Sequence, residues 1–313
     1  MSYLRTYGPA ADAATRLNWG LIGISLAVTL IIGVLVLWGS LRRRPPAVMD
    51  ANGRLPVGPA HGGLRWIYVG VGISALVLLA STVWTVQTLS AIAAPPQQAR
   101  VNIKITAHQW WWEVEYSDQS PTQTFVTANE VHIPVGEPVQ FKLASADVIH
   151  SFWIPQLAGK RDLIPGQENF AWLQADQPGI YRGQCAEFCG AQHAHMALHV
   201  IAEERSRFEA WRAAELQPLS SEAAQAPGAP IFAQRCAVCH TVRGTSAHGR
   251  LGPDLTHLMA RSHIAAGILP NNSGALHGWV ADAQAVKPGS LMPAMKLTAD
   301  DLHSVVAYLQ QLR

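Results

Sequence analysis

Two long stretches without a charged residue dominate the pattern of apolar and polar positions near the start of the chain. They cover residues 17–41 and 66–98 and consist mostly of Leu, Ile, Val, Ala and Gly. Each exceeds the roughly 20 apolar residues that a helix needs to cross a bilayer. Buried core helices, or a cleaved signal peptide for the first stretch, fit such long runs less well. The pattern therefore predicts two transmembrane helices, at about 17–41 and 66–94.

The segment between these stretches is basic. It holds five arginines and one acid: Arg42, Arg43, Arg44, Arg54, Arg65 and Asp50. Because loops rich in Lys and Arg stay in the cytoplasm, the predicted helices form a hairpin with its loop inside the cell. The N-terminus and everything after residue 95 are then expected on the outer side of the membrane, in an oxidising compartment.

After Pro95 and Pro96 the pattern changes to an alternation of apolar and polar residues. Short runs of this kind are separated by Gly, Pro, Asn and Asp, and their apolar positions are Val101, Ile103, Ile105, Val139, Phe141, Leu143, Leu198 and Val200. A period of two is typical of strands with one buried face. Residues 99–205 are therefore predicted to form a β-sandwich or barrel.

A change of composition marks the end of this region. Residues 206–227 are rich in Ala, Ser, Pro and Gln and are predicted to be a linker. The last segment, 228–313, ends in a helical pattern that begins after Thr298, a candidate N-cap. Its size suits a small helical domain.

Charge excludes one class of partner and suggests another. The 313 residues carry a net charge of only +2, so a nucleic-acid partner is not expected. Residues 100–205 hold seven Lys and Arg against twelve Asp and Glu, a net charge of −5, whereas residues 228–313 hold seven against four, a net charge of +3. Opposite charges on tethered domains favour docking of one on the other.

A cluster of soft metal ligands lies near the end of the predicted β region. Cys185, Cys189, His193 and Met196 fall within twelve residues, and His150 follows an apolar strand upstream. Thiolate and thioether ligands select copper or zinc over magnesium or calcium. A disulfide between the two cysteines is one alternative and a zinc site another, although zinc seldom takes a thioether.

The remaining two of the four cysteines form a second motif. Residues 236–240 read CxxCH, the attachment site of a c-type haem. Half of a zinc site is the alternative. The segments Gly252–Leu255 and Lys287–Pro293 follow this motif, a context that favours haem over zinc. One polypeptide is thus predicted to carry two redox centres.

The first motif resembles the dinuclear copper (CuA) loop of cytochrome c oxidase subunit II. The likeness extends to the aromatic segment 108–116, to the segment 160–166 and to the two-helix hairpin. It implies a cupredoxin-like Greek-key β-barrel in which Cys185 and Cys189 bridge two copper ions. His150 and His193 would each bind one copper.

The same resemblance assigns three further roles. Met196 would be a weak ligand to one copper and the backbone carbonyl of Glu187 would serve the other. The Glu187 carboxylate would help to hold a magnesium ion shared with subunit I. Trp110 would be the surface aromatic residue where electrons arrive, and His195 is expected to be a bystander.

The segment 228–313 resembles a class I cytochrome c, an all-α domain. Cys236 and Cys239 would hold the haem through thioether bonds and His240 would be its proximal ligand. Met292 would be the distal ligand, with Met295 as its rival. Ligation by Met and His suits electron transfer.

As a whole, the chain resembles subunit II of a haem–copper oxidase with a cytochrome c domain fused at its C-terminal end, as in caa-type oxidases. The resemblance implies a multi-pass protein of the bacterial inner membrane that passes electrons from a donor, a cytochrome or a quinol–cytochrome reductase complex, through haem c and CuA. The oxygen-reducing site would lie in subunit I, and subunit III would be a further partner.

Two other functions stay open at this point. They are the CuA subunit of a nitric oxide reductase and a stand-alone membrane-anchored electron carrier. One departure from the family pattern concerns proton uptake, because residues 63–72 contain no acid where many members have one. Another group would have to supply protons.

Overall fold

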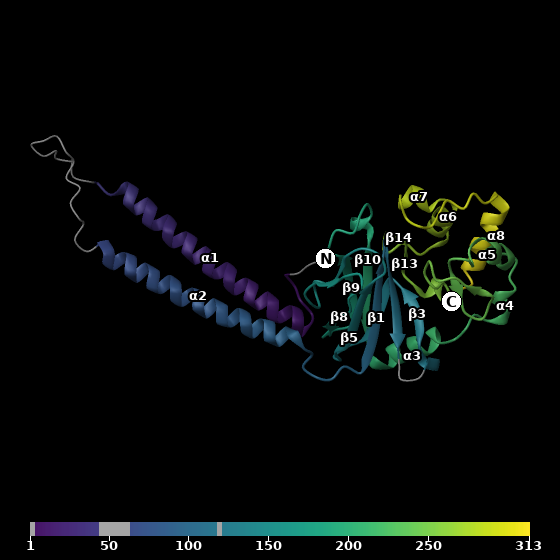
Figure 1. The fold of residues 1–313 in the computed structure, drawn as a ribbon, viewed down its shortest axis with the longest axis horizontal. Helices are drawn as coiled ribbons and strands as arrows, with labels where there is room; N and C mark the ends of the chain where they lie inside the picture. Colours follow the sequence, from purple (N-terminus) through teal and green to yellow (C-terminus); the bar gives the residue numbers. More distant parts are fainter. Residues whose placement is uncertain (1–3, 44–62, 118–120) are drawn as a thin grey trace, which may run out of the picture. The chain divides into compact units, whose positions relative to one another are not determined.

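A computed structural model describes residues 4–43, 63–117 and 121–313, so Arg44, Asp50, Arg54 and Asp118 lie outside the described residues. The chain separates into two units (Figure 1). One holds residues 13–93, and the other holds residues 1–12 and 94–313.

The first unit consists of two long apolar helices that lie side by side and antiparallel, α1 (Pro9–Leu41) and α2 (Gly63–Ala93) (Figure 1). Nearly all of their large apolar side chains are exposed, as expected of helices that face lipid. Gly20 lets the helices approach closely, since a Cβ there would lie 2.3 Å from the Trp84 ring. The two predicted spans are confirmed as apolar helices long enough to cross a membrane.

Helix α1 begins eight residues earlier than the predicted span. Pro9 stands at its first position and Asp12 in its first turn, both favourable at a helix N-terminus. The residues just before it add to the β domain (residues 99–205): the Tyr7 amide donates to Gln156 O at 2.8 Å, and the Tyr7 carbonyl accepts from the Asp176 amide at 2.7 Å.

The β domain is a cupredoxin-like sandwich of two five-stranded sheets. Their strand orders are β3-β2-β1-β5-β8 and β4-β10-β9-β6-β7. The strands are β1 (Val101–His108), β2 (Trp111–Ser117), β3 (Phe125–Ala128), β4 (Glu130–Pro134), β5 (Val139–Ser145), β6 (His150–Trp153), β7 (Arg161–Leu163), β8 (Asn169–Leu173), β9 (Gly179–Cys185) and β10 (Ala197–Glu203).

The predicted alternation sets the register of this sandwich. Strands β1 and β5 pair in parallel so that Ile103 lies opposite Phe141 and Ile105 opposite Leu143. All four side chains are buried between the sheets, while their polar neighbours face outward. This core provides the scaffold for the loops at the end of the domain.

Residues 206–227, predicted as a linker, contain two helices in the structure, α3 (Arg205–Glu215) and α4 (Ser221–Ala224). Helix α3 packs on the β domain, where the Trp211 ring stacks on His132 with centroids 4.0 Å apart. Leu219 and Ala223 belong instead to the core of the C-terminal domain (residues 228–313).

The C-terminal domain is mainly helical. Its elements are α5 (Ala229–Arg235), β11 (Thr241–Val242), β12 (Ala247–His248), β13 (His263–Ile264), β14 (Leu269–Pro270), α6 (Ser273–Ala281), α7 (Ala283–Val286) and α8 (Ala299–Leu309). Helices α5 and α6 both pack on α8, and the rings of Phe232 and Tyr308 meet at 5.3 Å. The Thr298 hydroxyl caps α8 by accepting from the Asp301 amide at 3.2 Å.

Candidate redox centres

The predicted copper ligands come together from three places in the β domain. Strand β6 begins at His150 and pairs with β9, which ends at Cys185. The loop after β9 carries Cys189 and a short 3₁₀ turn with His193, and Met196 stands immediately before β10. The sheet therefore fixes His150 and Cys185, and the loop folds the other ligands back over them.

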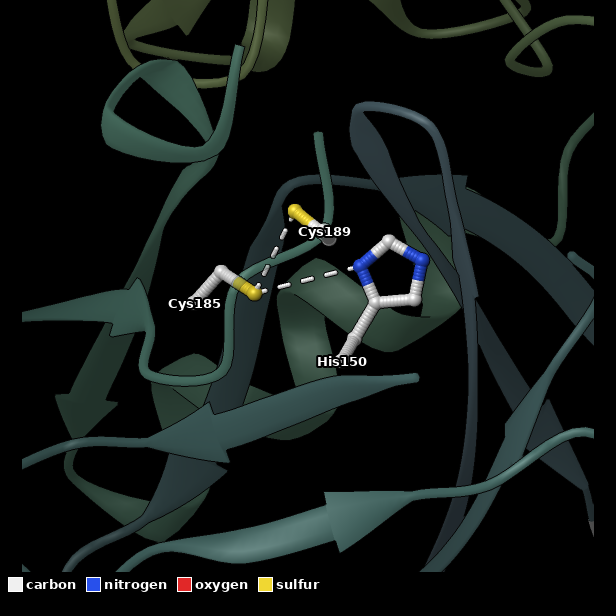
Figure 2. Close-up of side chains that lie close together, drawn as sticks. All are labelled: His150, Cys185 and Cys189. Carbon is white, nitrogen blue, oxygen red and sulfur yellow. Dashed lines mark hydrogen bonds between the residues drawn. The ribbon is translucent and has the colours of Figure 1, made fainter. Parts of the chain in front are cut away.

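The two sulfur atoms lie close together but are separate thiols. Cys185 Sγ is 3.7 Å from Cys189 Sγ, well beyond the roughly 2.05 Å of a disulfide, and 3.8 Å from Nδ1 of His150 (Figure 2). Both cysteines and His150 are buried. The disulfide alternative does not describe this structure.

The remaining donors surround the same pair of sulfurs. Cys189 Sγ lies 3.5 Å from Nδ1 of His193 and 3.9 Å from Sδ of Met196. The carbonyl oxygen of Glu187 lies 3.3 Å from Cys185 Sγ. Two thiols, two imidazoles, a thioether and a carbonyl thus converge on one place, a soft donor set that fits copper.

Electrostatics also favour bound cations between the sulfurs. The hydrogen bond from Cys189 is the main cause that lowers the pKa of Cys185 to about 3, and the bond to His150 adds to it. The same bond and burial raise the pKa of Cys189. Negative charge at Cys185, close to a second thiol, therefore favours the binding of a cation between the two sulfur atoms.

A carboxylate outside the donor set orients His150. Asp147 Oδ1 accepts from Nε2 of His150 at 2.8 Å, which leaves Nδ1 facing the sulfur. Asp147 Oδ2 also accepts from the Gln109 amide at 2.6 Å. The sequence offered only proximity as a signal for Asp147, three residues before the ligand.

Two other side chains of this loop, those of Glu187 and His195, make polar contacts outside the ligand cluster. The Glu187 carboxylate is about half exposed and lies 3.4 Å from Nζ of Lys160. His195 is exposed and bonds Oε1 of Gln192 at 2.7 Å.

Trp110 was expected to be a surface residue, but only 7% of it is exposed. Its indole Nε1 donates to the Cys189 carbonyl at 2.9 Å. Its own carbonyl accepts from Nζ of Lys287, in the C-terminal domain, at 2.6 Å. A Cβ on Gly289 would lie 3.6 Å from the indole ring, so the segment 287–289 covers Trp110.

Lys287 is buried at this contact. Its Nζ donates to a second carbonyl, that of Ala265, at 3.2 Å. Burial lowers the pKa of Lys287 to about 7, against the opposing effect of negative charge at Cys189. Gln192 adds a bond from its Nε2 to Pro288 O at 2.8 Å. Sequence reasoning missed Lys287 and Gln192, because nothing in their local pattern points to a partner far along the chain.

The haem motif follows α5 directly. Cys236 and Cys239 are free thiols at the partly exposed end of this helix, and burial raises the pKa of Cys236 to about 11. Nδ1 of His240 donates to Pro253 O at 2.8 Å, which leaves Nε2 as the metal-binding nitrogen. Gly252 makes room for this ring, since a Cβ there would lie 2.7 Å from Cε1 of His240.

Three exposed apolar side chains lie within the haem motif or directly before Gly252 and Met292 in the sequence. Val238, Leu251 and Leu291 are exposed by 73%, 69% and 81%. Such apolar exposure suits residues that a haem covers. Met292 and Met295 are both partly buried, and their carbonyls accept from Gln284 and Arg235 respectively.

Comparison with known proteins agrees with both domains. Residues 119–203 match the family "Cytochrome C oxidase subunit II, periplasmic domain", and residues 225–313 match "Cytochrome c". Cytochrome c oxidase subunit 2 of Alkalihalophilus pseudofirmus is 38% identical over 264 residues, covering 81% of this chain and 75% of that protein. Its namesake from Bacillus sp. strain PS3 is 33% identical over 267 residues, covering 79% and 73%.

Among solved structures, the periplasmic domain of cytochrome oxidase subunit II from Bradyrhizobium japonicum is 31% identical. The match covers 38% of this chain and 95% of the Bradyrhizobium japonicum chain, and its TM-score is 0.36.

The fold and the two donor sets define a membrane-anchored electron-transfer subunit of a haem–copper terminal oxidase, with a periplasmic copper-type domain and a cytochrome c domain. More particularly, the chain belongs to the cytochrome c oxidase subunit 2 family. Membership implies a catalytic subunit I as its partner.

Proposed function

We propose that this chain is the electron-input subunit of a proton-pumping oxidase and that the C-terminal domain delivers electrons to the β domain through Trp110. The contact between these domains carries the proposal. The backbone of Trp110 is bonded to Lys287, and its indole is bonded to Cys189. A continuous chain of covalent and hydrogen bonds thus links the C-terminal domain to a copper-ligand residue.

Each of the two domains provides the ligands of one redox centre. In the β domain His150, Cys185, Cys189, His193 and Met196, with the Glu187 carbonyl, would hold two copper ions. In the C-terminal domain Cys236 and Cys239 would attach haem c, and His240 and Met292 would ligate it. When bound, these groups accept and release one electron at a time.

The protein around the copper ligands keeps their geometry fixed. Asp147 and the β6–β9 pairing hold His150 and Cys185 in place. A rigid donor set changes little when an electron arrives, which keeps transfer fast. The half-exposed Glu187 carboxylate, which pairs with Lys160, would contribute to a magnesium ion shared with subunit I.

Family membership and charge support the remaining assignments of this proposal. The hairpin loop with Arg42, Arg43 and Arg65 lies in the cytoplasm, and the N-terminus and both redox domains lie on the periplasmic side. Electrons leave for subunit I, where oxygen is reduced to water. Residues 1–98, 99–205, 206–227 and 228–313 are the anchor, copper domain, linker and haem domain, and subunit III and a donor cytochrome or reductase complex complete the assembly.

A truncation tests the proposed route. A chain that ends after residue 215 keeps α3 on the β domain but lacks the haem domain. In the purified oxidase it should retain full copper content and lose most of its rate of donor oxidation. The same rate with the same donor would show that the haem domain is an accessory.

Purification of the complete oxidase addresses the other functions considered. The chain should co-purify with a multi-span catalytic subunit that consumes oxygen. Consumption of nitric oxide alone would assign it to a nitric oxide reductase, and purification without any such subunit would assign it to a free-standing carrier.

A further inference from the structure

Three potential metal ligands outside the copper and haem sets meet where the two redox domains touch. Glu130 starts β4, His199 lies in the neighbouring strand β10, and His263 starts β13 of the C-terminal domain. Strands β4 and β10 pair in parallel with Glu130 opposite His199. One ligand atom from each of the three residues lies within 4.8 Å of the other two.

One ring nitrogen of the buried His199 makes no hydrogen bond within the described part of the chain. His199 is 7% exposed, and its Nδ1 has no hydrogen-bond partner among the residues that the structure describes. A buried polar atom left in this way costs stability unless something binds it. Its ring stacks on that of His263 with centroids 4.5 Å apart.

The β13–β14 hairpin packs closely on this imidazole at a glycine. Gly267 lies close to it with a positive φ of 81°, and a Cβ there would be 3.5 Å from Cε1 of His199. The Ala197 amide donates to Ala266 O at 3.1 Å, which holds the β13–β14 hairpin against β10. The lack of a side chain at Gly267 lets the hairpin, and with it His263, come close to β10.

The carboxylate is fixed by the other domain. Glu130 is 3% exposed, and its Oε1 accepts from the Ser262 amide at 2.8 Å, from the His263 amide at 3.3 Å and from the Ser262 hydroxyl. The two domains therefore already meet at this acid, and the His263 ring is held beside it.

We propose that Glu130, His199 and His263 form a binding site for a divalent zinc ion that joins the two redox domains. Two imidazoles and one carboxylate are a ligand set that zinc takes, with a water as the fourth ligand. The set contains no thiolate or thioether, so it differs in chemistry from the copper loop. Glu130 offsets one of the two charges of the ion.

A bound zinc ion would hold the two domains together, because two ligands come from the β domain and one from the C-terminal domain. An ion that binds only the docked arrangement favours it by about 100-fold when the free zinc concentration is 100 times the dissociation constant. The exposed Arg182 lies opposite His199 on β9 and opposes a cation, so Arg182→Gln should tighten zinc binding.

The test uses the complete purified oxidase, stripped of loosely bound metal and titrated with zinc. Zinc content per complex and the zinc X-ray absorption spectrum are recorded for the wild type and for Glu130→Gln, His199→Gln and His263→Gln. The wild type should bind a zinc with nitrogen and oxygen neighbours, and each variant should weaken it by about 100-fold or more. Copper and haem contents that match the wild type verify folding.

His303→Gln is the matched control, because His277 and His303 form another histidine pair with centroids 6.0 Å apart within the C-terminal domain. It should bind zinc like the wild type. Zinc should also slow hydrogen exchange of the Ser262 and His263 amides in the wild type and the control. The proposal is overturned if the wild type binds no zinc, if zinc has sulfur neighbours, if the three variants bind it unchanged, or if exchange does not slow.

Discussion

Trp110 touches both redox domains, and its substitution separates two roles. Trp110→Ala removes the whole ring. Trp110→Phe keeps a smaller ring, but loses the indole edge that faces Gly289 and the Nε1 bond to the Cys189 carbonyl, a bond worth about 1 kcal/mol. Haem-to-copper transfer should slow strongly in Trp110→Ala and mildly in Trp110→Phe, with copper content unchanged. Flash-induced transfer in the complete oxidase measures both rates.

Trp111→Ala provides the control for this prediction. Trp111 stacks on His108 with centroids 4.3 Å apart, and its position in β2 is next to Trp110. Its removal should leave the transfer rate near that of the wild type. Equal slowing in both alanine variants would mean that the aromatic segment acts only through stability.

The distal haem ligand is a second question at this scale. Met292→Ala should abolish the sulfur-to-iron absorption band and lower the haem potential, because a thioether favours ferrous iron. Met295→Ala should preserve both. Visible spectra and redox titrations of the two variants decide the assignment, and loss of the band in Met295→Ala alone would exchange the two roles.

Lys287 makes docking depend on pH in a defined window. Its pKa is lowered from 10.5 to about 7, mainly by burial, so the docked state binds fewer protons than an undocked one. Docking should therefore strengthen as pH rises from about 7 to about 10.5 and weaken as it falls back toward 7. A neutral amine still donates to both carbonyls. The interdomain transfer rate measured across this window should follow the same trend.

Lys287→Met should flatten that pH profile, whereas Lys142→Met should keep it, since Lys142 is a half-exposed residue paired with Glu168 on the β domain. An unchanged profile in Lys287→Met would show that another group causes the alkaline effect.

A separate effect is expected below pH 6.5. Burial lowers the pKa of His199 below its usual value of 6.5 in the docked state. The docked state is therefore most stable, as far as this group is concerned, above pH 6.5, and it loses stability as the pH falls below 6.5.

At the scale of elements, α3 shows how the segment after the β domain is anchored. Trp211 contacts the rings of Tyr116, Phe125 and His132 in three strands. Trp211→Ala should destabilise the β domain by about 1–3 kcal/mol, because the ring is only partly buried. Thermal unfolding of the complete oxidase, followed through the copper absorption, measures this loss. Arg207→Ala, an exposed position on the same helix, should have little effect.

The elements also show where sequence reasoning succeeded and stopped. Uncharged apolar runs predicted the two membrane helices, and local periodicity predicted the apolar positions of β1 and β5 and the terminal helix α8, where burial of one face repeats along the element. It did not predict helices α3 and α4 in the segment after the β domain. Their stability comes from contacts such as Trp211 with His132 and Leu219 with the C-terminal core, which composition cannot reveal.

The same limit applies to the functional sites. Spacing brought together Cys185, Cys189, His193 and Met196, since these ligands share one loop. The covering of Trp110 by Lys287 could not be predicted, because the two residues are 177 positions apart and meet only through the packing of two domains.

At the scale of the whole molecule, the −5 and +3 net charges predicted electrostatic docking. Among the described residues, no ion pair within 4.0 Å joins a Lys or Arg of the C-terminal domain to an acid of the β domain. The contacts found are hydrogen bonds such as those of Lys287, Gln192 and Glu130. Raising the salt concentration should therefore slow interdomain transfer only modestly, because such bonds and the covalent tether are little screened.

The most direct test of the relay is the order in which the two centres are reduced in the complete oxidase. A flash-generated reductant supplies one electron, and haem and copper absorption are followed in time. We predict that the haem is reduced first and that copper then gains the electron in a first-order step whose rate is independent of enzyme concentration. Reduction of copper before the haem, or a copper step whose rate rises with enzyme concentration, would contradict transfer within one chain.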